Sequence, residues 1–227
     1  MTKGLFITGT GTDVGKTFAT GVLVKTLREA GVNCGYYKAA LSGAERQGEC
    51  LIPGDAAFVK EMANLTDAYE ELVSYCYETA VSPHLAAQIE GNPVELSKVV
   101  QDYAALSQRY SRILVEGSGG IVCPIRWDEQ RHWMLTDVIR TLNLPVLLIS
   151  QSGLGSINNA VLTVSYCKAQ GIDVRGIVMN QFHPEDKMEQ DNKRMIETLT
   201  GIPVVGTIGE GQTTPDLAVA RLIELFE

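Results

Sequence analysis

Six short apolar runs, rich in β-branched and aromatic residues, alternate along the chain with stretches of helical periodicity. The runs are GLFITGT (4–10), VNCGYYKA (32–39), RILVEGSG (112–119), PVLLIS (145–150), VRGIVMN (174–180) and IPVVGTI (202–208). Several are apolar on both faces, which is typical of strands in a parallel sheet that helices cover on both sides. The alternation predicts an α/β fold: a single domain over residues 1–227, with a doubly wound, mostly parallel sheet flanked by helices.

Local signals place three of the expected helices. One should run over 16–30 and end at Gly31, a natural helix stop. Ser82 and Pro83 suit the N-cap and first position of a helix through HLAAQIE. A third is expected over 155–170, where apolar residues fall on one stripe. The C-terminal segment TPDLAVARLIELFE is amphipathic but acidic, so we expect it to pack on the sheet.

Composition excludes several classes of function. A net charge of −8 argues against a nucleic-acid-binding surface. No apolar run approaches the roughly 20 residues of a membrane span, and the N-terminus lacks the apolar region of a signal peptide. The five scattered cysteines show neither metal-ligand spacing nor a disulfide framework. These features predict a cytoplasmic protein that acts on neither nucleic acid nor membrane.

The segment GTGTDVGKT (9–17) resembles a phosphate-binding loop but does not fit the usual pattern G-x-x-x-x-G-K-[ST]. Counting back from Gly15, that pattern asks for glycine where Thr10 stands. The context is nevertheless right, because an apolar strand precedes the loop and a helix follows it. Lys16 is placed to reach terminal phosphates, and the Thr17 hydroxyl to bind Mg²⁺. A glycine-rich turn with a surface lysine is the alternative, and we favour a nucleotide site.

Such a loop needs carboxylates for its metal ion. Glu116 ends an apolar strand, where a metal-binding acid is expected, although a solvent-exposed strand end is its simplest interpretation alone. Asp55 follows IPG and also suits a helix N-cap. Lys38 ends the second expected strand, which we place beside the first. There it would repel Lys16 unless an anion lay between them.

Other residues narrow the chemistry. Asn180 ends a strand but is followed by QFH instead of the K-x-D of guanine-binding proteins, which favours adenine. The three histidines lack metal-ligand spacing, and no Ser-His-Asp or Cys-His set can be argued. We therefore expect phosphoryl transfer to a bound substrate, with no protein nucleophile.

These motifs resemble the dethiobiotin synthetase family, whose phosphate loop G-T-x-T-x-V-G-K-T carries the same one-residue extension. The resemblance extends over essentially the whole chain: Lys38 with SG (42–43), GD (54–55), SPHLAA (82–87), VEGSGG (115–120), GLGSINNA (153–160) and MN (179–180). It implies a P-loop NTPase-like fold and a ligase of biotin biosynthesis. The family closes the ureido ring of dethiobiotin from 7,8-diaminopelargonate, CO₂ (or bicarbonate) and ATP, with Mg²⁺, through a carbamate and a carbamic-phosphoric anhydride.

The resemblance also implies roles for individual residues. Lys16 and Lys38 would be catalytic, flanking the carbamate and the γ-phosphate, and Thr12 and Ser42 would contact the substrate. The metal ligands would be Thr17, Asp55 and Glu116. The nucleotide would be bound by Asp13, Val14, Gly15, Lys16, Thr17, Phe18, Glu116, Gly117, Ser118, Gly119, Asn180 and Gln181. The substrate carboxylate would be held across a homodimer interface by Gly155, Ser156, Ile157 and Asn158.

Two departures and two alternatives accompany this interpretation. KAALSG stands where the family usually has Lys-Pro-Val, and GTIGEG (206–211) where it often has Ile-Pro. Gly209 in the latter leads us to hypothesise relaxed nucleotide selectivity. A ParA- or MinD-like ATPase switch is the main alternative, but those loops carry an early lysine in K-G-G-x-G-K-T that this chain lacks. A cobyrinate synthase would need a further domain with a nucleophilic cysteine, for which the chain is too short.

Overall fold

A computed structural model describes residues 2–227. The strands are β1 (Lys3–Gly9), β2 (Cys34–Ser42), β3 (Glu45–Gln47), β4 (Cys50–Ile52), β5 (Val73–Tyr77), β6 (Arg112–Glu116), β7 (Pro124–Trp127), β8 (His132–Met134), β9 (Val146–Gln151), β10 (Val174–Asn180) and β11 (Val204–Ile208). The helices are α1 (Lys16–Glu29), α2 (Gly54–Met62), α3 (Tyr69–Leu72), α4 (Pro83–Glu90), α5 (Leu96–Leu106), α6 (Leu135–Leu142), α7 (Ser156–Ala169), α8 (Lys187–Thr200) and α9 (Val219–Glu224).

Seven strands form the central sheet, in the order β11-β10-β9-β1-β6-β2-β5. Every neighbouring pair in this sheet is parallel. The remaining strands form two small antiparallel hairpins, β3–β4 and β7–β8. The doubly wound α/β fold expected from the sequence is confirmed, and each of the six expected strands is present.

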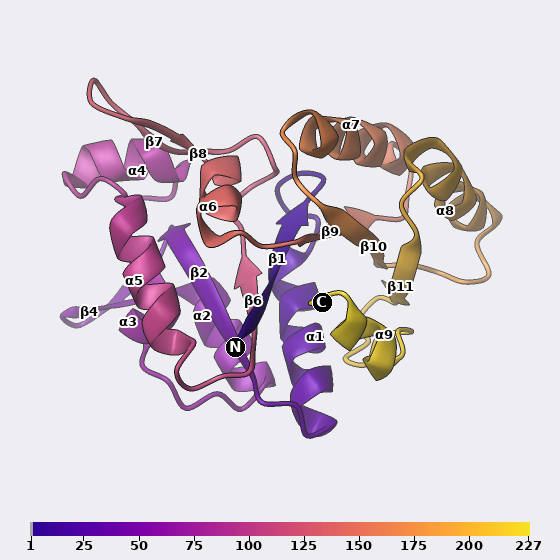
Figure 1. The fold of residues 1–227 in the computed structure, drawn as a ribbon, viewed down its shortest axis with the longest axis horizontal. Helices are drawn as coiled ribbons and strands as arrows, with labels where there is room; N and C mark the ends of the chain where they lie inside the picture. Colours follow the sequence, from indigo (N-terminus) through magenta and orange to yellow (C-terminus); the bar gives the residue numbers. More distant parts are fainter. Residues whose placement is uncertain (1) are drawn as a thin grey trace.

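Two helical layers cover the sheet (Figure 1). Helices α4 to α8 pack on one face, where side chains such as Phe6 and Val115 are fully buried. Helices α1, α2, α3 and α9 pack on the other, over Ile7 and Leu114. The C-terminal segment packs on this face of the sheet, as the sequence predicts, beside α1, and buries Phe226 there. Because consecutive side chains of a strand point to opposite faces, strands buried on both sides read as continuous apolar runs.

Helix ends follow the expected local rules at two of three positions. Helix α1 ends at Glu29, and Gly31 adopts the left-handed conformation with φ 81°. Helix α4 begins at Pro83, although the Ser82 side chain makes no capping hydrogen bond. The N-cap role considered for Asp55 is wrong: α2 begins at Gly54 after Pro53, and Asp55 lies in the first turn.

Two expectations about the second strand are also wrong. Strand β2 continues to Ser42, so Lys38 lies in its middle and not at its end. Strand β6 lies between β1 and β2, so the second strand is not beside the first. The insertion aligns Lys38 with Glu116 on the neighbouring strand, in the same register position. The edge strand β5 was not predicted because Ser74 interrupts its apolar pattern. The two hairpins were not predicted because their strands have only three or four residues.

Candidate functional site

The phosphate loop connects β1 to α1 at the carboxyl edge of the sheet. Gly15 is the N-cap of α1 and has φ 85°, in the left-handed region. A β-carbon there would lie 2.1 Å from Asn180 Nδ2, so both the backbone conformation and the close approach require glycine. Within residues 2–227 no side chain caps α1, and its first turn holds no acid. The first N–H groups of α1 are therefore free to bind an anion.

Lys16 folds back over this loop. Its ammonium donates a hydrogen bond to the Gly11 carbonyl (3.1 Å), and only 8% of the residue is exposed. Burial lowers the pKa of Lys16, and the positive charge of Lys38 lowers it further. An anion bound between the two ammonium groups would relieve that repulsion, which is what the sequence led us to expect.

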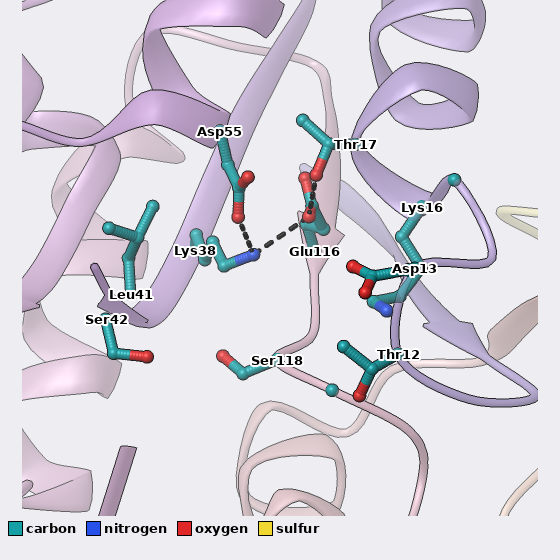
Figure 2. A pocket seen from close by; sticks show the side chains of 12 residues that line it. Thr12, Asp13, Lys16, Thr17, Lys38, Leu41, Ser42, Asp55, Glu116 and Ser118 are labelled. Carbon is teal, nitrogen blue, oxygen red and sulfur yellow. Dashed lines mark hydrogen bonds and ion pairs between the residues drawn. The ribbon is translucent and has the colours of Figure 1, made fainter. Parts of the chain in front are cut away.

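Lys38 is the centre of a charge cluster that no continuous stretch of sequence contains. Its ammonium lies 2.5 Å from Asp55 Oδ2 and 2.8 Å from Glu116 Oε1, and the Thr17 hydroxyl donates to that same Glu116 oxygen at 2.8 Å. Figure 2 shows Lys38 pointing between the two acids, with Thr17 above Glu116. Strand β2, strand β6, helix α1 and helix α2 each contribute one member of this cluster.

The charges of this cluster stabilise one another. Burial alone would lower the pKa of Lys38, but the carboxylates of Glu116 and Asp55 outweigh burial and raise it. Burial likewise disfavours the charged form of Asp55, yet the neighbouring Lys38 lowers the pKa of Asp55 below its usual value. Lys38 is therefore a cation near neutral pH although it is almost fully buried.

The donor set fits Mg²⁺. Two carboxylates and the Thr17 hydroxyl converge on one point, and Mg²⁺ prefers a few such oxygen ligands together with water and substrate phosphates. Residues 2–227 contain no group of three or more His, Cys, Asp or Glu side chains that could hold a metal ion by themselves. The Lys38 ammonium now supplies the positive charge between the acids. A divalent cation at this point would have to displace it.

A cavity of about 310 Å³ opens between the phosphate loop and this cluster. It is lined by Thr12, Asp13, Gly15, Lys16, Thr17, Lys38, Leu41, Ser42, Asp55, Glu116, Ser118 and Gly119. All but Leu41 were named from the sequence. The Ser118 hydroxyl donates to the Ala40 carbonyl (2.6 Å) and so ties the loop after β6 to β2. Leu41 was missed because it is one more apolar residue in a strand.

A second cavity, of about 330 Å³, lies beyond the end of β10 and includes Gln181 in its lining. Asn180 connects the two regions, since its Nδ2 donates to the Val14 carbonyl of the phosphate loop (3.1 Å). Its Oδ1 is buried and has no hydrogen-bond partner within residues 2–227. His183 and Glu210, which the sequence did not single out, also line this cavity. Nearby, Gly209 N donates to Gln212 Oε1 (3.2 Å) and closes a tight turn.

The remaining expected residues lie around these cavities. Val14, Phe18 and Gly117 adjoin the first cavity in sequence without lining it. Residues 155–158 do not line it either, and form the start of α7. Gly155 has φ 91°, and within the described chain no side chain caps this helix. Ser156 N donates to the Gly153 carbonyl (3.2 Å), which leaves the N–H groups of Ile157 and Asn158 free.

Comparison with known proteins finds relatives that match most of the chain. A family model described as an AAA domain matches residues 3–214. The ATP-dependent dethiobiotin synthetase BioD of Brachyspira hyodysenteriae is 46% identical over 93% of this chain and 94% of its own length. The protein of that name from a Clostridium perfringens strain is 48% identical over 92% and 91%, and one from Clostridium botulinum is 43% identical over 100% and 99%.

Solved structures with the same fold are more distant. A ParA family ATPase from Chlorobium tepidum has a TM-score of 0.58 at 13% identity, covering all of this chain and 91% of its own. The MinD cell division protein of Aquifex aeolicus has a TM-score of 0.55 at 13% identity, covering 99% and 85%. At these identities the likeness shows the fold alone. No helix within residues 2–227 is long and apolar enough to cross a membrane.

Proposed function

The chain belongs to the dethiobiotin synthetase family, and from that membership we propose that its first cavity converts 7,8-diaminopelargonate, CO₂ and ATP into dethiobiotin, ADP and phosphate. The proposal rests chiefly on the cluster of Lys38, Asp55, Glu116 and Thr17. This cluster lies beside the phosphate loop and the uncapped N-terminus of α1. A ParA- or MinD-like switch is disfavoured, because those structures share only the fold and the loop here has no early lysine.

The substrate supplies the nucleophile in the proposed reaction. One amine combines with CO₂ and loses a proton, which gives a carbamate. A carbamate oxygen attacks the γ-phosphorus and ADP leaves. The second amine then attacks the carbamate carbon and loses its proton, the ureido ring closes, and phosphate leaves. The protein contributes position and charge, which suits a site without a nucleophilic side chain.

The polar and charged residues around the phosphate loop and the Lys38 cluster have distinct roles in this proposal. The N–H groups of α1 and the ammonium of Lys16 hold the β- and γ-phosphates. Lys38 stabilises the negative charge shared between carbamate and phosphate. Thr12 and Ser42 orient the diamine. Thr17, Asp55 and Glu116 would hold Mg²⁺, which supplies neutralisation of the phosphate oxygens when bound.

The product identifies the activity directly. Phosphate release from ATP is measured in the presence of Mg²⁺ and bicarbonate, with and without the diamine. The organic product is identified by mass spectrometry. Release that requires the diamine and yields a ring-closed product supports the proposal. Slow release that is indifferent to the diamine contradicts it.

We further propose that Asn180 recognises adenine. Its buried Oδ1 lacks a donor, and the exocyclic amine of adenine supplies one, whereas a purine with oxygen at that place presents a second acceptor. ATP should therefore bind about fivefold more tightly than inosine triphosphate, since one such hydrogen bond is worth about 1 kcal/mol. Asn180→Ala should bring the ratio near one. Calorimetric titration of both nucleotides checks this. Equal affinities in the wild type would instead favour the relaxed selectivity suggested by Gly209.

The free N-terminus of α7 supports a substrate site shared between two subunits. Residues 155–158 lie outside the first cavity, and helix N–H groups favour a carboxylate. Leu154 beside them is 94% exposed and Leu162 on α7 is 62% exposed, as expected of a surface covered in a homodimer. We propose that this surface is the dimer interface.

We also propose that the 227 residues act as one domain and that the protein is cytoplasmic.

Subunit mixing tests the shared site. Asn158→Asp adds a negative charge where the substrate carboxylate would bind, and Lys38→Met removes the proposed catalytic cation. At a low concentration of the diamine each variant alone should be nearly inactive. A random mixture should recover about a quarter of wild-type activity, because half the dimers contain one complete site. A mixture no more active than the mean of its components would contradict a shared site.

A further inference from the structure

The two carboxylate oxygens of Glu116 have different partners. Oε1 faces the first cavity and accepts hydrogen bonds from Lys38 (2.8 Å) and Thr17 (2.8 Å). Oε2 accepts a hydrogen bond at 3.0 Å from the hydroxyl of Tyr36, a residue that does not line the cavity. Glu116 is only 1% exposed, so this arrangement is held within the protein without contact to bulk water.

Tyr36 comes from the same strand as Lys38. The two residues are two positions apart on β2, so their side chains lie on the same face of the sheet. Tyr36 is fully buried and packs in the apolar layer that contains Leu114. Burial, and then the charge of Glu116, raises the pKa of Tyr36 well above its ordinary value. The Tyr36 hydroxyl is the donor in the hydrogen bond to Glu116.

We propose that Tyr36 is a positioning residue for the metal ion: by holding Oε2, it makes Glu116 present only Oε1 to Mg²⁺. The inference rests on the proposed function, in which Glu116 is a metal ligand. Mg²⁺ demands near-ideal octahedral geometry, which a carboxylate that binds through one fixed oxygen satisfies. A carboxylate free to rotate could offer both oxygens, which larger ions such as Ca²⁺ accept more readily.

The adjacent tyrosine provides a matched control. Tyr37 is also fully buried on β2, but it lies on the opposite face of the sheet. Its hydroxyl is 2.5 Å from the Ser74 hydroxyl and donates to the Val99 carbonyl (3.2 Å), with no contact to Glu116. Tyr36→Phe and Tyr37→Phe thus remove the same atom from neighbouring buried positions and leave both rings in place.

Mn²⁺ binding tests the proposal without turnover. Mn²⁺, which also prefers six oxygen ligands, is titrated by electron paramagnetic resonance into the protein with a non-hydrolysable ATP analogue. We expect Tyr36→Phe to weaken Mn²⁺ binding about 10- to 100-fold, as is typical when a hydrogen bond to a metal ligand is lost. The Mn²⁺ affinity of Tyr37→Phe should stay within about twofold of wild type, because the Tyr37 hydroxyl bonds no metal ligand. Equal Mn²⁺ affinity in the two variants would overturn the positioning role.

Two further measurements separate the possible failures. Glu116→Gln should also weaken Mn²⁺ binding strongly. If it does while Tyr36→Phe binds like wild type, only the role of Tyr36 fails. If Glu116→Gln binds like wild type, the metal site itself fails and the inference with it. Competition by Ca²⁺ tests the single-oxygen geometry: the preference for Mn²⁺ over Ca²⁺ should narrow in Tyr36→Phe, and an unchanged preference would contradict it.

Discussion

Replacing Lys38 by methionine is expected to lower the rate of ring closure about 10³-fold while ATP binding stays within about threefold of wild type. Lys38 is the cation that pairs with both Asp55 and Glu116, and its charge is maintained despite burial. In the proposed reaction that charge stabilises the transferring phosphoryl group, whereas the phosphate loop and Lys16 provide most of the nucleotide binding. Single-turnover phosphate release measures the rate, and calorimetric titration measures the affinity for ATP.

The same variant should change how the protein responds to Mg²⁺ alone. Without Lys38, two acids of the cluster lose their counter-charge, and removing one partner of a buried ion pair costs about 3 kcal/mol. Mg²⁺ can then enter without displacing an ammonium group, so it should raise the melting temperature more in the variant than in wild type. Lys25→Met, on the outer part of α1, is the control.

Full activity in Lys38→Met would remove Lys38 from the catalytic residues.

Replacing Glu116 by glutamine is expected to raise the Mg²⁺ concentration for half-maximal activity on the order of 100-fold. Each tenfold in that concentration corresponds to about 1.4 kcal/mol of lost Mg²⁺ binding. The substitution keeps the size of the side chain but removes the charge of one of the three carboxylates that line the cavity. Saturating Mg²⁺ should restore much of the rate, because the ligand geometry is largely retained.

A surface acid provides the comparison for Glu116. Glu61→Gln removes the same charge from the exposed side of α2 and should leave the Mg²⁺ titration unchanged. If Glu116→Gln gave the same titration as Glu61→Gln, Glu116 would be no more than the buried end of a strand. The metal would then have to be held by other groups.

The features fixed by neighbouring residues could be predicted from the sequence. The phosphate loop, the six long strands and the end of α1 at Gly31 depend on contiguous patterns of apolar residues and glycines. The ordered family motifs also named eleven of the residues around the first cavity.

What could not be predicted depends on pairing between distant segments. Strand β6 follows β2 by about seventy residues, yet it lies between β1 and β2 and aligns Glu116 with Lys38. No local pattern reveals that insertion. The hydrogen bond from Tyr36 to Glu116 follows from the same alignment, although the alternation of strand faces already puts Tyr36 and Lys38 on one side. Local patterns and family motifs therefore predict the candidate residues, and the strand order determines how those residues meet.

In the proposed reaction a carbamate oxygen of the substrate attacks the γ-phosphorus of ATP. Bicarbonate labelled with ¹⁸O tests this step most directly, in short reactions with the diamine, ATP and Mg²⁺. We expect the released phosphate to carry one oxygen from bicarbonate for each ring closed, because that oxygen bridges carbon and phosphorus before phosphate leaves. Released phosphate that carries no ¹⁸O, with dethiobiotin still formed, would contradict attack by the carbamate.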